Sequence, residues 1–433
     1  MAERLAWSRP RHRVAHRLSG IYRGWWLASA IAMVAFSTSP FVNPVLGVFM
    51  TPLQEEFGWG RGAIAGALSL GTLAGAGLTV LIGPLLDRFG GRPFMAAATV
   101  VMVVALVLLS RIETSWQYYL LFGAGRAMLI GVVTVASTVT IANWFIRNRG
   151  RATAIHLAGG RGGMALMPLL TLALVALLGW RGAFVALGGL VLVAGVLPAI
   201  LVLRRRPEDH GLRPDGDAAP AVSGAGVAAP QTGPSVSDPY WSVHDVLRTP
   251  AFWLLVFGTS QVFVVSGAVN LSMIPHFEDQ GLPSGLAASV VTAWALLGIV
   301  GGMIGSELVQ RIGIRYTLAA SMAVTAAGLA WLIFVTNVWM AFGFAVVHGL
   351  AFGAQMPLSQ LVYPEYFGRW TIGAVSGITQ PIQWLLGAGG PVIASVAFDW
   401  RGSYDAVFAA YVVMSLVGGA LIFLARQPVR ARA

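Results

Sequence analysis

The sequence contains no cysteine and no lysine, and it carries little charge for its length. Without cysteine the chain has no disulfide, thiolate metal site or thiol nucleophile. Without lysine it has no Walker A phosphate loop, which needs that side chain, so an ATP-driven pump on this chain is excluded. Only 10% of the 433 residues are charged and 57% are apolar, whereas soluble proteins carry about 25% charge. The composition indicates a membrane protein, and no spacing typical of an enzyme nucleophile, a metal site or a cofactor is present.

Apolar runs long enough to cross a bilayer, about 20 residues each, recur along the chain. We expect twelve helices, at residues 24–49, 62–85, 93–110, 116–142, 151–177, 182–203, 250–275, 284–309, 315–334, 338–363, 371–396 and 403–425. They divide the chain into a basic N-terminal segment (1–23), a six-helix bundle (24–203), a linker (204–248), a second six-helix bundle (249–425) and a tail (426–433).

All 28 basic residues are arginines, and the predicted loops share them unequally. With both ends of the chain on one side of the membrane, 22 arginines fall on that side and four on the other. The positive-inside rule then places both termini in the cytoplasm, with the protein spanning the inner membrane many times. The net charge of +11 thus reflects topology and contact with membrane lipid, and nucleic-acid binding is not expected.

Short sequence patterns recur about 220 residues apart. The turn Gly83–Pro93 (GPLLDRFGGRP) has a weaker copy at Gln310–Arg315 (QRIGIR), and Trp180-Arg181-Gly182 returns as Trp400-Arg401-Gly402. Repeats at a fixed spacing indicate an internal duplication. We therefore expect two parallel, pseudo-symmetric halves of six helices each.

The first of these turns resembles the signature loop between the second and third helices of the major facilitator superfamily, G-x-L-x-D-R-x-G-R. The residues that fall on this pattern are Gly83, Asp87, Arg88, Gly90 and Arg92. The resemblance implies an all-α membrane protein, with twelve transmembrane helices in two six-helix bundles, that acts as a transporter and not as an enzyme.

The resemblance also implies a gating role for the charged turns of both halves. Their side chains would latch the halves together when the central cavity faces outward: Asp87, Arg88, Arg92, Arg311 and Arg315.

Several loops look like those of the bacterial oxalate/formate antiporter and monocarboxylate porter group. They are Phe57-Gly58-Trp59, Trp144-Phe145, Arg206–Gly216 and Glu365–Arg369. That group binds its anion with an arginine on helix 8 and a lysine on helix 11, and neither has a counterpart here. We therefore expect the anion site of this chain in its first half.

Two arginines, Arg126 and Arg161, lie near the middle of predicted helices, without an acidic residue at comparable depth. Ionisable groups in such positions are candidates for function, and arginine binds carboxylates with two hydrogen bonds. A structural alternative exists for each. Arg126-Ala-Met-Leu-Ile-Gly131 resembles a family motif on helix 4 whose arginine bonds the backbone, and the glycines around Arg161 would let helix backbones cap its guanidinium.

Neutral polar and aromatic side chains complete the candidate substrate site. They are Asn43, Gln261, Asn270, Gln355, Gln380, Gln383 and Trp384. His348 is a candidate proton relay, with a hydrogen-bonded packing role as the alternative.

These observations predict a secondary active transporter for a small organic anion, a mono- or dicarboxylate, that works by alternating access. Proton symport and anion exchange both remain open, and a monomer is expected. The alternative is proton-driven efflux of drugs or other small hydrophobic metabolites; a cationic drug would require a buried carboxylate, which the sequence does not offer.

Overall fold

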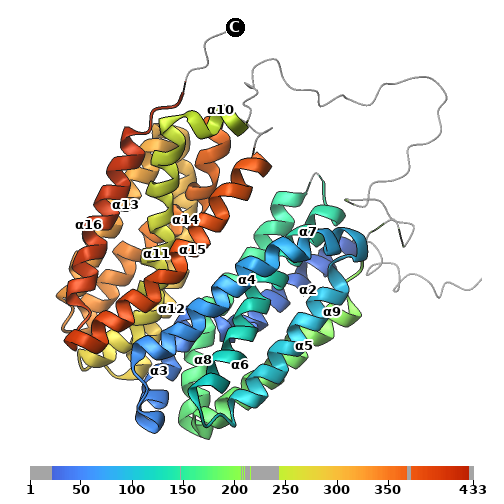
Figure 1. Cartoon of the computed structure of the whole chain (residues 1–433), viewed down its shortest axis with the longest axis vertical. Helices are drawn as coiled ribbons and strands as arrows, with labels where there is room; N and C mark the ends of the chain where they lie inside the picture. Colours follow the sequence, from blue (N-terminus) through green and yellow to red (C-terminus); the bar gives the residue numbers. More distant parts are fainter. Residues whose placement is uncertain are drawn as a thin grey trace, which may run out of the picture.

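The computed structural model describes residues 22–146, 148–205, 207, 209, 215, 243–367 and 372–428. Within these ranges the chain is helical and contains no strand. Figure 1 shows two bundles of long helices side by side, one from each half of the sequence.

The N-terminal half consists of α2 (Arg23–Ser37), η1 (Ser39–Phe41), α3 (Asn43–Phe57), α4 (Arg61–Phe89), α5 (Gly91–Leu109), α6 (Ser115–Met128), η2 (Leu129–Val133), α7 (Thr134–Trp144), α8 (Arg149–Val191), η3 (Leu192–Val196) and α9 (Leu197–Leu201). The C-terminal half consists of α10 (Val243–Arg248), α11 (Pro250–Asp279), α12 (Ser284–Ile312), α13 (Ile314–Ile333), α14 (Val338–Phe367), α15 (Ile372–Arg401) and α16 (Asp405–Leu424).

Ten helical segments of the described chain are long and apolar enough to cross a membrane. One of them, Gly150–Leu201, contains a sharp turn at Gly179, whose φ of 69° is left-handed, a conformation that glycine adopts without a steric penalty. This segment therefore supplies two crossings. The broken series α2–η1–α3 supplies one more, which gives the twelve crossings that the sequence predicted.

The first crossing differs from the single helix predicted at 24–49. It is interrupted between α2 and α3, where Pro40 lies in η1. Proline cannot donate a backbone hydrogen bond, and its ring disturbs the preceding helical turn. Arg126 of α6 donates from Nη1 to the carbonyl oxygen of Phe41 at 2.9 Å. The break is thus held by a side chain from a different helix.

The two ends of the bundle differ in how the halves meet. We call the end that carries residues 58–60, 280–283 and 402–404 the far end, and the end that carries α10 and the start of α2 the linker end. The halves pack through α4 on α15, α3 on α11 and α8 on α12. In Figure 1 their ribbons lie close at the far end and diverge toward the linker end.

Hydrogen bonds join the halves along these helix pairs. The Asn43 side-chain amide donates to the carbonyl oxygen of Gly267 at 2.9 Å, and the Ser69 hydroxyl to that of Ala388 at 2.6 Å. Nearer the middle, the Thr292 hydroxyl of α12 donates to the carbonyl oxygen of Ala165 in α8 at 2.5 Å.

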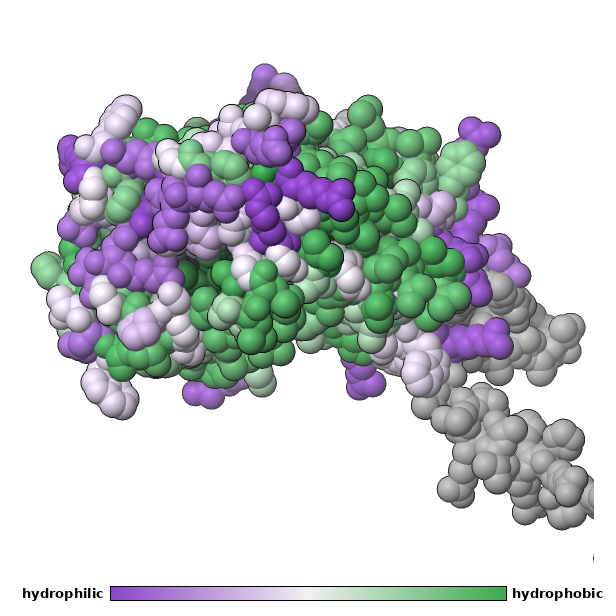
Figure 2. Space-filling view, turned by 90° about the horizontal axis from the view of Figure 1, so that it is seen from below, coloured by the Kyte–Doolittle hydropathy of each residue, from purple (hydrophilic) through white to green (hydrophobic). Residues whose placement is uncertain are grey.

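The outer surface is suited to a lipid environment. In Figure 2, which views the molecule from the far end, a broad hydrophobic surface lies beside a region rich in hydrophilic residues. Many large apolar side chains are exposed, among them Leu177 at 80%, and Trp339 and Trp400 at 82% and 84%. Exposed apolar helices of this length belong in a bilayer, and tryptophans at helix ends are typical of its boundary.

Candidate functional site

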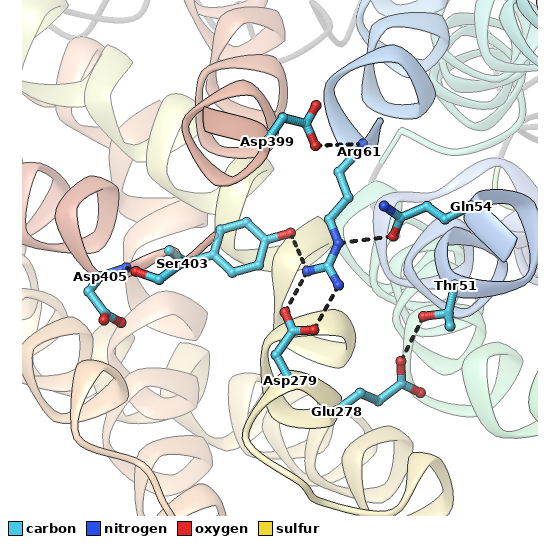
Figure 3. A network of polar contacts seen from close by, with 9 residues as sticks. Thr51, Gln54, Arg61, Glu278, Asp279, Asp399, Ser403 and Asp405 are labelled. Carbon is cyan, nitrogen blue, oxygen red and sulfur yellow. Dashed lines mark hydrogen bonds and ion pairs between the residues drawn. The ribbon is translucent and has the colours of Figure 1, made fainter. Parts of the chain in front are cut away.

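A network of charged groups ties the halves together at the far end (Figure 3). Arg61, the first residue of α4, forms two hydrogen bonds to the carboxylate of Asp279 at the end of α11, at 2.6 and 2.8 Å. The same guanidinium donates to the Tyr404 hydroxyl at 3.1 Å and to the Gln54 amide oxygen at 3.1 Å. One side chain of the N-terminal half is therefore held by two residues of the other half.

Burial strengthens this ion pair. The Arg61 side chain is 7% exposed and that of Asp279 33%, and the guanidinium carbon lies 3.9 Å from the centre of the Phe398 ring. Burial also raises the pKa of the Tyr404 hydroxyl, so this group stays neutral and remains an acceptor for Arg61. A buried arginine left without its acidic partner is destabilised, which favours the contact between Arg61 and Asp279.

A second contact at the far end involves the backbone. The carboxylate of Asp399, near the end of α15, accepts hydrogen bonds from the backbone amides of Arg61 at 2.9 Å and Gly62 at 2.8 Å. These are the first amides of α4, which carry the positive end of the helix dipole. The fit leaves no spare room, since a β-carbon at Gly60 would lie 2.7 Å from an Asp399 oxygen.

We call Arg61, Asp279, Asp399, Tyr404 and Gln54 the far-end gate. A further contact beside it, Thr51 to Glu278 at 3.1 Å, also joins the halves. The sequence predictions did not single out Arg61 or these acidic residues. A signal was present in the loops with few arginines. Those of the C-terminal half carry Asp279 and Asp399, and one of the N-terminal half carries Arg61.

Arg161 lies in α8 before its kink at Gly179 and reaches toward α12 of the other half. A β-carbon added at Gly298 would lie 3.0 Å from its Nη1 atom, so the guanidinium lies directly against the backbone of α12. Arg161 is half-buried. Among the described residues, no hydrogen bond or ion pair engages it. The structure thus places Arg161 beside the opposite half, and its predicted role in substrate binding stays a prediction.

Arg161 lines a small cavity of about 10 Å³, together with Met164, Trp294, Phe352 and Gly298. A cavity of this size holds about one water molecule. A carboxylate is larger than this cavity.

His348 lies behind this cavity and is held by Trp294. The indole Nε1 donates to His348 Nδ1 at 2.8 Å, while Nε2 is buried with no partner among the described residues. The imidazole is sandwiched against Phe344 and Phe352 at ring distances of 5.0 and 6.2 Å. Because Nδ1 accepts, the neutral ring carries its proton on Nε2. The relay role predicted for His348 remains a prediction.

Arg126 is placed differently from Arg161. It is 8% exposed, and its Nε donates to the Thr72 hydroxyl at 3.1 Å while Nη1 donates to the Phe41 carbonyl. All these groups belong to the N-terminal half. The structure therefore shows the backbone bonding that was the alternative for this residue.

The other predicted polar residues are engaged mostly within the C-terminal half. Gln355 donates to the Ser321 carbonyl at 3.0 Å and to the Thr325 hydroxyl at 2.7 Å. Gln383 bonds Thr259 at 3.0 Å.

Asn270 donates to the Ser266 carbonyl at 2.7 Å. Its Oδ1 atom, like Gln261 Nε2, is buried with no partner among the described residues. Trp384 contacts the Phe263 ring at 5.7 Å, and Gln380 is exposed. Asn43 bridges the halves, as given above.

The residues predicted to gate the linker end make local contacts. Arg88 and Arg92 are exposed, and Arg311 pairs with Glu307 one helical turn away at 2.8 Å. Arg315 donates to the Phe423 carbonyl from Nε at 2.6 Å. The side chain of Asp87 lies outside the described residues. Since this end is the open one, its gating role is a prediction about another conformation.

Two halves of six membrane-crossing helices, with polar groups between them and contacts concentrated at one end, define a secondary transporter architecture. The family model for the Major Facilitator Superfamily matches residues 25–288 and 255–433. The chain belongs to this superfamily, as its sequence motifs predicted.

Relatives cover most of the chain at low identity. It is 24% identical to the fujikurins efflux protein of Gibberella fujikuroi, a match covering 93% of this chain and 82% of that protein. It is also 24% identical to monocarboxylate transporter 11 of Mus musculus, covering 89% and 84%. A solved structure of a bacterial homolog to the human lysosomal transporter Spinster, in an inward-facing and occupied conformation, matches with a TM-score of 0.69 and 16% identity. The match covers 93% of this chain and 97% of that one, and it shows a shared fold only.

Proposed function

We propose that this protein is a secondary transporter for a small organic anion, a carboxylate attached to a compact apolar or aromatic body. The observation that carries the proposal is the Arg161 guanidinium, which points from one half toward the other without a protein counter-ion among the described residues. A cation held this way at a moving interface suits an anion that enters when the halves separate.

The surroundings of Arg161 support the apolar part of the substrate. Trp294, Phe352 and Met164 line the same cavity, and such side chains pack against hydrocarbon or rings. Relatives named for monocarboxylate transport and for efflux are both compatible with an organic acid as substrate.

The far-end gate gives a physical basis for alternating access. By the arginine distribution the far end faces outward, and the gate then holds the carrier open to the cytoplasm. Transport to the other side would require the Arg61–Asp279 pair and the Asp399 contact to break while the charged turns of the linker end come together.

We further propose that transport is anion exchange. When both ends are closed, an empty carrier leaves Arg161 desolvated and unpaired, which is costly. A bound carboxylate neutralises it, so the loaded carrier crosses this state more easily than the empty one. In proton symport, the proton would instead travel on the carboxylate itself or through His348.

The test is uptake of labelled carboxylates by proteoliposomes loaded with unlabelled carboxylate, left empty, or given a pH gradient. Exchange predicts fast uptake only in the loaded vesicles. Arg161→Gln should weaken carboxylate binding by about tenfold to a hundredfold, as for lost hydrogen bonds to a charged group. Gly298→Ala should weaken it less, because the guanidinium is displaced and not removed.

Arg111→Gln is the matched control, since Arg111 is an exposed arginine of the far end. Unchanged carboxylate affinity in both the Arg161 and Gly298 variants would contradict the proposed site. Movement of lipophilic cations alone would contradict the anion and favour the efflux alternative.

A further inference from the structure

A second cavity lies at the linker end of the N-terminal half, away from the interface between the halves. Its volume is about 250 Å³. The start of α2, the end of α7 and the end of α9 surround it, through Arg23, Trp144 and Leu201.

Two arginines line this cavity, Arg23 and Arg204. Arg204 donates from Nη1 to the carbonyl oxygen of Leu203 at 3.0 Å, and no carboxylate pairs with either arginine among the described residues. The N-terminus of α2 adds partial positive charge, since no side chain among the described residues caps it. The cavity therefore has a positive wall, and none of the described residues that line it is acidic.

The remaining wall is apolar and opens to the lipid-facing surface. Trp26 is 57% exposed and Leu201 65%. Trp144 forms the floor; its indole donates to the Arg204 carbonyl at 3.3 Å, and its own carbonyl accepts from the Tyr22 hydroxyl at 3.1 Å. These bonds fix the arginine backbone and the tryptophan relative to α2.

We propose that this cavity binds the phosphate headgroup of an anionic phospholipid. The phosphate would lie between Arg23 and Arg204, with the acyl chains along Trp26 and Leu201. The linker end is the arginine-rich end, and anionic lipids of the cytoplasmic leaflet attract such groups. A free phosphate satisfies the arginines equally well but gains nothing from the apolar wall.

The test measures lipid retention by native mass spectrometry and thermal stabilisation of the full chain in detergent. The probes are phosphatidylglycerol, phosphatidylcholine and inorganic phosphate. Phosphatidylglycerol should bind and stabilise, and the other two should not. The double variant R23Q/R204Q should lose about 25-fold in affinity for phosphatidylglycerol, at about fivefold for each arginine near a charged surface.

The matched control is R111Q/R401Q, which removes the same charge from exposed arginines of the far end and should bind as the natural chain does. Val202→Trp keeps every charge but fills the cavity, and should also lose binding, so the proposal does not depend on folding of the double variant. Full retention of phosphatidylglycerol by R23Q/R204Q and by Val202→Trp would overturn the proposal. An equal loss of phosphatidylglycerol affinity in R111Q/R401Q would show unspecific charge attraction and contradict the site. Stabilisation by inorganic phosphate equal to that by phosphatidylglycerol would assign the cavity to a free anion.

Discussion

Replacing Asp279 with asparagine removes the negative charge from the far-end gate and keeps its shape. In the natural chain the carboxylate accepts two hydrogen bonds from Arg61 at 2.6 and 2.8 Å. Hydrogen bonds to charged groups contribute about 1.5–3 kcal/mol each. Because Asp279 is one-third exposed and asparagine still accepts one bond, we expect a loss of about 2 kcal/mol.

This loss applies only to the conformation with the far end closed, since the two halves separate there in the other. The ratio of closed to open molecules should therefore fall about 30-fold. Asp399→Asn acts on separate donors, the amides of Arg61 and Gly62. The double variant D279N/D399N should shift the ratio further than D279N alone, and because both carboxylates contact Arg61 the combined shift should differ from the product of the two single effects.

The assay is a distance measurement between spin labels on cysteines placed at Trp116 and Trp400. Both side chains are exposed, at 64% and 84%, and they lie at the far end of different halves. The chain has no cysteine of its own, so labelling is confined to these two positions. A longer distance should become populated in D279N and dominate in the double variant.

Glu56→Gln is the control for this measurement. Glu56 pairs with Arg181 at 2.7 Å, also at the far end but within the N-terminal half, with both side chains more than 40% exposed. It should leave the distances unchanged. If the double variant shows the same distances as the natural chain, the far-end gate does not hold the halves together.

Two further substitutions test Arg126, which is bonded within the N-terminal half, and Trp294, which lines the proposed anion site. Arg126→Gln should lower the free energy of unfolding by about 2 kcal/mol or more, because the buried Phe41 carbonyl loses its charged donor. Thermal unfolding measures this loss. The folded fraction should keep its carboxylate affinity, and a lost affinity would return Arg126 to the binding site. Trp294→Phe leaves His348 Nδ1 without its donor, which should lower the free energy of unfolding by about 1–3 kcal/mol. It should also weaken carboxylate binding, because the cavity wall loosens. Unchanged stability and binding would contradict a supporting role for Trp294.

The sequence predicted the helices well because crossing a bilayer is a local requirement. A run of about 20 apolar residues satisfies it without reference to the rest of the chain. The break at Pro40 was less predictable, since a proline in a membrane helix can produce a kink or a full interruption. In the structure the break is accompanied by Arg126, which lies 85 residues from Phe41 in the sequence and donates to the Phe41 carbonyl.

The site shows the same limit more clearly. Arg126 and Arg161 are equivalent by depth and by their lack of nearby acids, yet one is bonded within its own half and the other faces the opposite half. The far-end gate joins Arg61 to Asp279, 218 residues apart. Such pairings follow from how the helices pack, which no local pattern contains.

The Asp399 contact has a consequence for how this protein can vary. Its donors are peptide groups, which every substitution other than proline preserves, so the partner of Asp399 cannot be lost by changing a side chain at positions 61 and 62. A larger side chain at position 60 or 62 would disturb the contact. A β-carbon would lie 2.7 Å from an Asp399 oxygen at Gly60, and 2.7 Å from a Val396 methyl at Gly62. At this contact, closure depends on small residues at positions 60 and 62 as well as on the carboxylate of Asp399.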